Sequence, residues 1–154
     1  MDDAYWMHAA LAEAQRACDD DEVPIGCVIV AQDRLLAKAH NQTRRLLDPT
    51  AHAEVVAITQ AANALHSERL TETTLYVTVE PCAMCIGAIM WARVSRLVFG
   101  AADAKAGACG SVVDLAANER LNHHLTITRG VLATEAGSLM TAFFEHLRRQ
   151  GKGS

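Results

Sequence analysis

The sequence predicts an α/β fold in which helices flank a central sheet, partly parallel with an antiparallel pair at its edge. Three observations predict this fold class. The chain has 154 residues, of which 51% are hydrophobic, enough for one domain with a substantial core. Two strand-like segments near the start are separated only by a short turn, which indicates a hairpin. After them, helical and strand-like segments alternate, which is typical of parallel strands covered by helices.

The first part of the chain is predicted to form a helix and a hairpin. Small and apolar residues recur at helical spacing over 3–18, which predicts the first helix. The acidic run 19–22 is expected to be a solvated loop. Strands are predicted over 25–30 and 35–40, joined by a turn at 32–34.

The rest of the chain is predicted to alternate between helix and strand. Helices are expected over 51–65, 81–93 and 136–149, and strands over 75–79, 96–100 and 125–128. Thr50 is the expected cap of the second helix, and Pro81 is expected in the first turn of the third, where its missing N–H costs nothing. Residues 1–150 are therefore predicted to form a single domain, followed by a mobile tail at 151–154.

Composition and charge restrict the function classes. No apolar run is long enough to cross a bilayer, and the acidic N-terminus lacks the features of a signal peptide, so we expect a cytoplasmic protein without a membrane partner. The five cysteines are an odd number, which argues against a disulfide framework. The net charge of −4 gives no global attraction to nucleic acid, so any RNA contact must use local basic residues.

A histidine and a cysteine pair carry the strongest chemical signal. His52 lies near the start of the second helix, and Cys82 and Cys85 open the third in a Pro-Cys-x-x-Cys segment. Alone, the cysteine pair suits a redox dithiol or half of a structural zinc site. Two thiolates and one imidazole are suitable zinc ligands, and three protein ligands leave a fourth position for water. We therefore expect one zinc ion per chain.

Glu54, two residues after His52, completes the set. It lies one residue too late to form a capping box with Thr50, so a role at the helix end explains it poorly. Residues two apart on a helix do not face the same way, so Glu54 is expected to serve the attacking water and not to bind the metal. A carboxylate in this place can move protons from water to a ring nitrogen and to a departing amine. The two motifs together are the signature of zinc-dependent nucleobase deaminases.

Longer blocks of the sequence resemble the bacterial tRNA-specific adenosine deaminases of the cytidine deaminase superfamily. These blocks are 22–26, 48–54, 74–82, 98–101, 103–105 and the terminal residues Phe143, Phe144, Arg148 and Arg149. The resemblance covers nearly the whole chain. It implies a three-layer α/β/α cytidine deaminase-like fold around a five-stranded mixed sheet, a homodimer, and hydrolysis of the wobble adenosine of a tRNA anticodon stem-loop to inosine.

The resemblance also implies substrate contacts. Asn41 matches an asparagine that binds the flipped base, and Asp103 matches an aspartate on the substrate-binding loop. Arg148 and Arg149 match a basic C-terminal helix that approaches the RNA backbone, and Lys105 is a further candidate for a phosphate contact. Without the resemblance, Asn41 suits a turn, Asp103 a loop or cap, and the arginines the C-terminal end of any helix.

Other functions fit part of the pattern. A deaminase of a free base or nucleotide, such as guanine or cytosine, would use the same zinc chemistry and suits the acidic net charge. A non-catalytic zinc-stabilised interaction protein would not need Glu54. A thioredoxin-like oxidoreductase would cycle Cys82 and Cys85 but leave His52 and Glu54 without a role.

The homodimer is also indicated by the helical segment 86–92, which is apolar on all sides. Such a helix must be buried on nearly every side, and a small domain has little interior for it. One face of this helix is therefore expected in a dimer interface.

Overall fold

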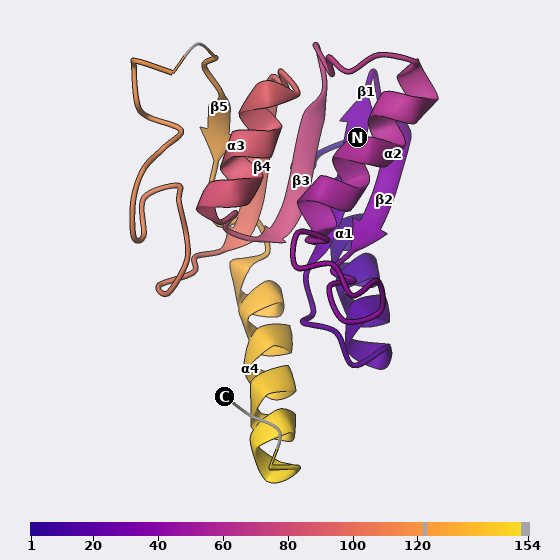
Figure 1. The fold of residues 1–154 in the computed structure, drawn as a ribbon, viewed down its shortest axis with the longest axis vertical. Helices are drawn as coiled ribbons and strands as arrows, with labels where there is room; N and C mark the ends of the chain where they lie inside the picture. Colours follow the sequence, from indigo (N-terminus) through magenta and orange to yellow (C-terminus); the bar gives the residue numbers. More distant parts are fainter. Residues whose placement is uncertain (122, 152–154) are drawn as a thin grey trace.

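The computed structural model describes residues 1–121 and 123–151, and its elements follow the order expected from the sequence (Figure 1). The helices are α1 (Asp3–Asp19), α2 (Ala53–Leu65), α3 (Ala83–Trp91) and α4 (Ala133–Arg149). The strands are β1 (Gly26–Ala31), β2 (Arg34–His40), β3 (Thr74–Val79), β4 (Arg96–Ala101) and β5 (Thr126–Thr128). Apart from Gly151, the predicted mobile tail lies outside the described residues.

The strands form one five-stranded mixed sheet in the order β2-β1-β3-β4-β5, which confirms the predicted sheet. β1 is antiparallel to both β2 and β3, whereas β3, β4 and β5 are parallel. His40 pairs with Gly26, and Val79 pairs with Ala101. The last residues of β2, β3 and β4 and the first residue of β1 therefore meet at one edge of the sheet, which we call the site edge.

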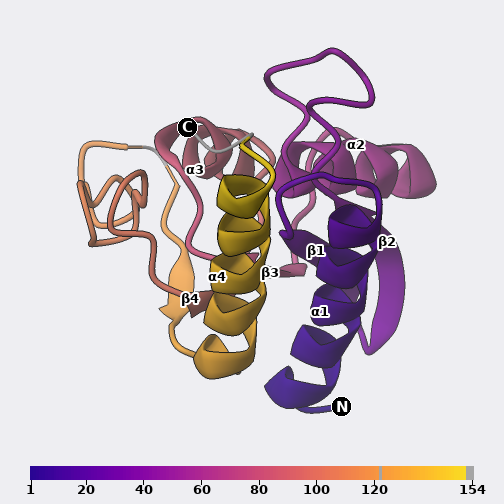
Figure 2. The ribbon, with the colours of Figure 1, turned by 90° about the horizontal axis from the view of Figure 1, so that it is seen from below.

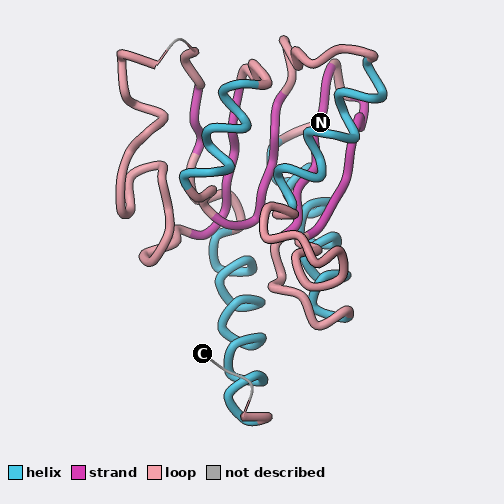
Figure 3. The backbone as a smooth tube through the Cα atoms, viewed as in Figure 1, coloured by secondary structure: helices cyan, strands magenta, loops and turns pink. Residues whose placement is uncertain are grey.

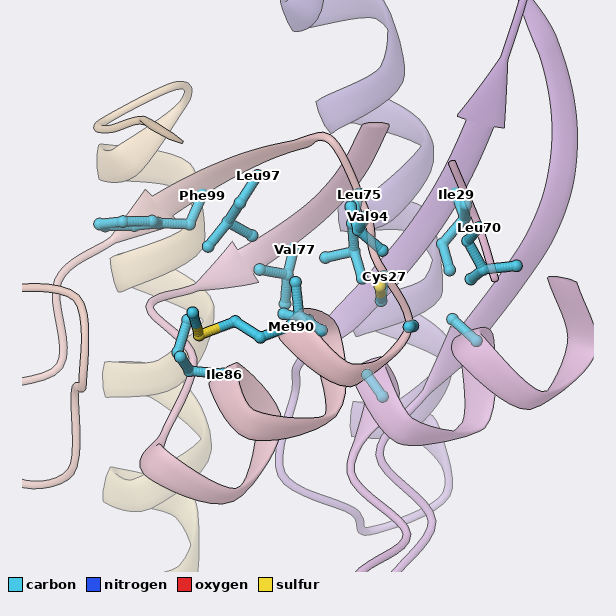
Figure 4. Packing of buried hydrophobic residues seen from close by; sticks show 14 of the residues in the cluster. Cys27, Ile29, Leu70, Leu75, Val77, Ile86, Met90, Val94, Leu97 and Phe99 are labelled. Atoms are coloured by element: carbon cyan, nitrogen blue, oxygen red, sulfur yellow. The ribbon is translucent and has the colours of Figure 1, made fainter. Parts of the chain in front are cut away.

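Helices cover both faces of the sheet, which confirms the three layers (Figure 2). Helices α2 and α3 lie on one face, where they pack on Ile29, Val77, Leu97 and neighbouring apolar residues (Figure 4). Helix α1 packs on the opposite face against Val28 and Val98, with α4 beside it. Alternate residues of each strand thus point to different layers, as the pleat of a strand requires.

Helix α1 is held against the sheet at two points. Near the site edge it crosses β1 so closely that a Cβ at Gly26 would overlap the Ala10 carbonyl, so only glycine fits there. At the start of the helix, the Asp3 carboxylate accepts hydrogen bonds from the Arg96 guanidinium, at 2.6 and 2.8 Å, and from the Tyr76 hydroxyl at 2.9 Å. These contacts fix α1 along its length.

Two predicted helix starts are wrong by two residues. Helix α2 begins at Ala53 with His52 as its N-cap, and Thr50 does not cap it because its N–H and hydroxyl both donate to the Asp48 carboxylate in a turn of its own. Helix α3 begins at Ala83 with Cys82 as its N-cap, so Pro81 precedes the helix. The shift places a metal-ligand candidate at each cap.

The far end of α3 also differs from expectation. The helix ends at Trp91, because Arg93 adopts a left-handed backbone with φ of 63°. The Trp91 side chain is 84% exposed, so the expectation that the helix is buried on nearly every side is wrong within one chain. The connection from β4 to β5 follows, and its described residues form neither helix nor strand (Figure 3). None of the described helices is long and apolar enough to span a membrane.

Candidate active site

The site edge of the sheet collects the residues that the sequence singled out. Asn41 follows the end of β2, and Cys82 comes three residues after the end of β3. Asp103 comes two residues after the end of β4. His52, at the start of α2, joins them because α2 and α3 lie side by side on one face. A mixed sheet with this strand order therefore brings distant segments to a single place.

His52, Cys82 and Cys85 form a compact cluster of metal-ligand atoms. Their nitrogen and sulfur atoms all lie within 4.8 Å of one another. His52 Nδ1 is 3.7 Å from Cys82 Sγ and 3.4 Å from Cys85 Sγ. Ligand atoms around a tetrahedral zinc ion are separated by about 3.5–3.8 Å, given its usual bond lengths. The spacing and the donor types both fit zinc.

The backbone explains why these side chains are free to act as ligands. His52 and Cys82 both have extended backbone at their helix caps, and neither side chain caps its own helix. Hydrogen bonds with Cys85 and His52 lower the pKa of Cys82 to about 4. The lowered pKa favours the thiolate of Cys82, which is the form that binds metal.

Glu54 lies beside this cluster. Its side chain is buried, and burial raises the pKa of its carboxyl, although its own backbone N–H and the nearby His52 act in the opposite direction. It also shares a hydrogen bond with the Cys85 side chain. A buried carboxylate next to a metal-ligand cluster is well placed to exchange protons with a substrate there.

Asn41 is buried at the end of β2. Its backbone N–H donates to the Ile25 carbonyl at 3.1 Å, and its Nδ2 lies 3.5 Å from Thr43 Oγ1. The loop that follows is held by Glu22, whose buried carboxylate accepts the backbone N–H groups of Arg44 and Arg45 at 3.1 and 2.8 Å. Asn41 therefore has a fixed place at the site edge, although its predicted contact with a base stays a prediction.

A groove of about 570 Å³ lies between α4 and the segment after β4. Asp103, Lys105 and Arg148 line it together with apolar residues that include Met140 and Phe144. Arg149 is not among its lining residues and instead lies 4.0 Å from Glu145, with both side chains exposed. The structure thus brings Asp103, Lys105 and Arg148 to one surface and leaves Arg149 outside it.

Asp103 also has a local structural role. Its Oδ1 accepts the backbone N–H groups of Lys105 and Ala106, at 3.0 and 3.2 Å. The carboxylate therefore closes a turn in the segment that forms one wall of the groove. These contacts fit the alternative interpretation of Asp103 as a loop or cap residue, and its predicted contact with the substrate stays a prediction.

Sequence reasoning missed the buried carboxylates Glu22 and Glu80, and the expectation of a solvated loop over 19–22 is wrong at Glu22. Glu80 follows β3 and accepts hydrogen bonds from Asp103, Cys109 and Ser111, far along the chain. Burial alone would raise its pKa, but these hydrogen bonds outweigh burial and lower the pKa below its ordinary value. The available signal was a carboxylate directly after a mostly apolar strand and two residues before a candidate metal ligand.

Comparison with known proteins shows the family. The model of the cytidine and deoxycytidylate deaminase zinc-binding region matches residues 1–101. The tRNA-specific adenosine deaminase of Bacillus subtilis (strain 168) is 43% identical over 152 residues, which cover 99% of this chain and 94% of that relative. The counterpart in Agrobacterium fabrum is 43% identical over 144 residues, which cover 94% of this chain and 95% of the relative.

A solved structure shows the same fold. One from studies of A-to-I editing by tRNA:A34 deaminases at the wobble position of transfer RNA superposes with a TM-score of 0.85 and 44% identity. The match covers 88% of this chain and 98% of that one. The ligand cluster, the fold and the near-complete alignments agree. The chain belongs to the cytidine and deoxycytidylate deaminase family and groups with its tRNA-specific adenosine deaminases.

Proposed function

We propose that the chain hydrolyses adenosine to inosine at the wobble position of a tRNA anticodon. The observation that carries this proposal is the cluster of His52, Cys82 and Cys85 beside the buried Glu54, in a chain that aligns along almost its whole length with tRNA-specific adenosine deaminases. In the reaction, water adds to C6 of the adenine ring, the bond from C6 to the exocyclic amino nitrogen breaks, and the products are inosine and ammonia.

One zinc ion per chain would be held by His52, Cys82 and Cys85. Zinc at such a site supplies a Lewis acid that turns water into a nucleophile near neutral pH. Glu54 takes a proton from the attacking water, places one on the ring nitrogen next to C6, and protonates the departing amine. Its burial beside the cluster keeps bulk water from competing for these protons.

The substrate is proposed to be the anticodon stem-loop and not a free base. An anticodon loop presents unstacked bases, so a flipped adenine reaches the cluster at low cost. Asn41 would hold the edge of the base, and Asp103 the substrate segment. Lys105 and Arg148 line the open groove and would meet backbone phosphates. The cytoplasm, where tRNA is used, is the proposed location.

The chain is also proposed to act as a homodimer. Trp91 at the end of α3 is almost fully exposed, and a cavity of about 170 Å³ beside it is lined by Met90, Leu121 and neighbouring residues. Large exposed aromatic side chains next to apolar pockets are typical centres of protein interfaces. A second copy of α3 would cover this surface.

The test is an assay of product formation. Purified protein with its zinc content measured is incubated with total bacterial tRNA and, separately, with free guanine, cytosine and adenosine. We expect about one zinc per chain, inosine at the wobble position of tRNA, and no ammonia from the free bases. Efficient release of ammonia from free guanine or cytosine with every tRNA unchanged would reject the tRNA substrate and favour the small-molecule alternative. Bound zinc with no activity on any substrate would favour a non-catalytic zinc protein.

A further inference from the structure

Glu80 occupies an unusual place between the metal-ligand cluster and the groove. It follows β3 directly, two residues before Cys82, and its side chain is only 4% exposed. Its backbone N–H donates to the Ala101 carbonyl at 2.8 Å, at the end of the neighbouring strand. The carboxylate therefore lies inside the site edge, where an unpaired charge would be costly.

Four donors satisfy this carboxylate, and all come from the segment 103–111. Oε1 accepts the Asp103 N–H at 3.0 Å and a short hydrogen bond from the Ser111 hydroxyl. Oε2 accepts the N–H groups of Cys109 and Ser111 at 2.9 and 3.2 Å. A single side chain thus holds both ends of the segment.

The same segment packs directly on Glu80 and on the turn that carries Cys82. A Cβ at Gly107 would overlap the Glu80 carboxylate, so the close approach requires glycine. Gly107 forms a β-bridge with Cys82, and the Ala108 N–H donates to the Pro81 carbonyl at 2.8 Å. The segment is therefore joined to the cysteine turn both directly, through the backbone, and through the Glu80 side chain.

A guanidinium supports the segment from the other side. Arg129 donates a short hydrogen bond to the Cys109 carbonyl and lies 5.5 Å from the centre of the Phe99 ring. The Cys109 peptide is thus held at its N–H by Glu80 and at its carbonyl by Arg129. This leaves little freedom to the wall of the groove that presents Asp103.

We propose that Glu80 is a positioning residue for the substrate. It fixes the segment 103–111, and with it Asp103 and Lys105, at a set distance from the cysteine ligands, so that a docked nucleotide and the reacting centre are in register. The effect on a docked nucleotide rests on the proposed function, whereas the fixing of the segment 103–111 by Glu80 does not. Misplacing a substrate-binding group by about 1 Å can cost about 10²-fold in rate.

The test compares Glu80→Gln with Glu13→Gln. Glu13 lies on α1, is only 5% exposed, and contacts Arg16 and His40. In Glu80→Gln the amide NH₂ group faces two N–H or O–H donors and cannot accept from them. We expect zinc content to be unchanged, amide hydrogen exchange to accelerate at 103–111, and kcat/KM for an anticodon stem-loop to fall by about 10²-fold. Glu13→Gln should leave exchange in that segment as in the unaltered protein.

A double-mutant cycle separates positioning from general damage. If Glu80 acts by placing Asp103, then Asp103→Ala should lower kcat/KM much less in the Glu80→Gln background than alone. Effects that multiply independently would overturn the inference, as would unaltered exchange at 103–111. Should Glu80→Gln not fold, Gly107→Ala moves the segment off Glu80 without removing a charge and should give the same loss. An inactive unaltered protein would reject the proposed function, while the exchange measurement would still decide the role of Glu80.

Discussion

Glu80 and Glu54 are two buried glutamates near the site edge, and their different surroundings give the same type of side chain two different roles. Glu80 is surrounded by donors from the main chain, and these hold its charge and its place. Glu54 is equally buried, but the only neighbours that favour its charge are its own backbone N–H and the side chains of His52 and Cys85. A carboxylate that is tightly satisfied orders structure, whereas one with fewer partners can gain and lose a proton.

Glu54→Gln is therefore expected to abolish activity without removing the metal. The amide has nearly the same size, so the protein should fold and hold zinc, but it cannot carry protons. Loss of a positioned acid/base group typically lowers the rate by ~10²–10⁴-fold. Deamination of an anticodon stem-loop under single-turnover conditions measures the rate constant of the chemical step, and metal analysis of the same sample is the control. An active Glu54→Gln enzyme with full zinc would remove Glu54 from the mechanism.

At this scale the sequence allowed the cluster of candidate metal ligands to be predicted, but not the residues that support it. His52, Cys82 and Cys85 were found because donor type and short spacing restrict the chemistry. Glu80 was missed because its role depends on a segment that returns 23–31 residues later, and no local pattern records that return. Partners that are distant along the chain are fixed by the fold, which a motif does not describe.

At the scale of elements, α4 separates two adjacent arginines. Arg148 lines the groove, whereas Arg149 lies beside Glu145 on an exposed face. Arg148→Ala should weaken binding of the stem-loop. It should also reduce the slope of the logarithm of the binding constant against the logarithm of the salt concentration by about 1, because one phosphate contact is lost. Arg149→Ala is the matched control and should change neither quantity much. Equal losses in titrations at several salt concentrations would contradict the proposed path of the RNA along the groove.

The attachment of α1 to the sheet predicts a dependence of stability on pH. The hydrogen bonds from Arg96 hold the pKa of Asp3 below its ordinary value of 3.8, although burial acts in the opposite direction. A carboxyl with a lowered pKa stabilises the fold above that ordinary value, and the contribution disappears as the pH falls through the lowered pKa. Burial and the bond to Asp3 also raise the pKa of Tyr76 to about 12, so its hydroxyl still donates at neutral pH.

Asp3→Asn should therefore lower the free energy of unfolding by about 1–2 kcal/mol at pH 7, given that the pair is partly exposed. The deficit should shrink as the pH falls below about 4. Denaturant unfolding at a series of pH values measures this difference. Glu145→Gln, which removes an exposed ion pair, is the control and should cost little at any pH. A deficit independent of pH would show that the charge of Asp3 does not stabilise the fold.

The helices and strands were predicted well where a hydrophobic pattern extends over many residues. The residues at which the helices begin were predicted poorly. All nine helices and strands of the described residues occur in the expected order. The start of α2 was misplaced because Asp48 competes for the groups of Thr50, and a sequence does not show which side chain wins that competition. Pro81 was placed inside a helix because proline suits a first turn as well as the residue before an N-cap.

For the whole molecule, the exposed end of α3 predicts the assembly. Trp91→Glu should convert a dimer to a monomer, because a charge in the middle of an apolar interface is left without a partner. Tyr5→Glu is the control, since Tyr5 on α1 is a 49% exposed aromatic residue on the opposite face of the sheet. Sedimentation velocity at micromolar concentration measures both variants. A stable, active monomer of the unaltered protein would contradict the proposed dimer.

The strand order also determines when the centre can assemble during folding. His52 precedes β3 in the chain and the cysteines follow it, while β3 lies in the middle of the sheet between an antiparallel and a parallel neighbour. The hairpin of β1 and β2 needs only local contacts and can form early, whereas the insertion of β3 closes long loops and is slow. His52, Cys82 and Cys85 converge only after that insertion. Capture of the proposed zinc ion would therefore be a late event that waits for the central strand to be in place.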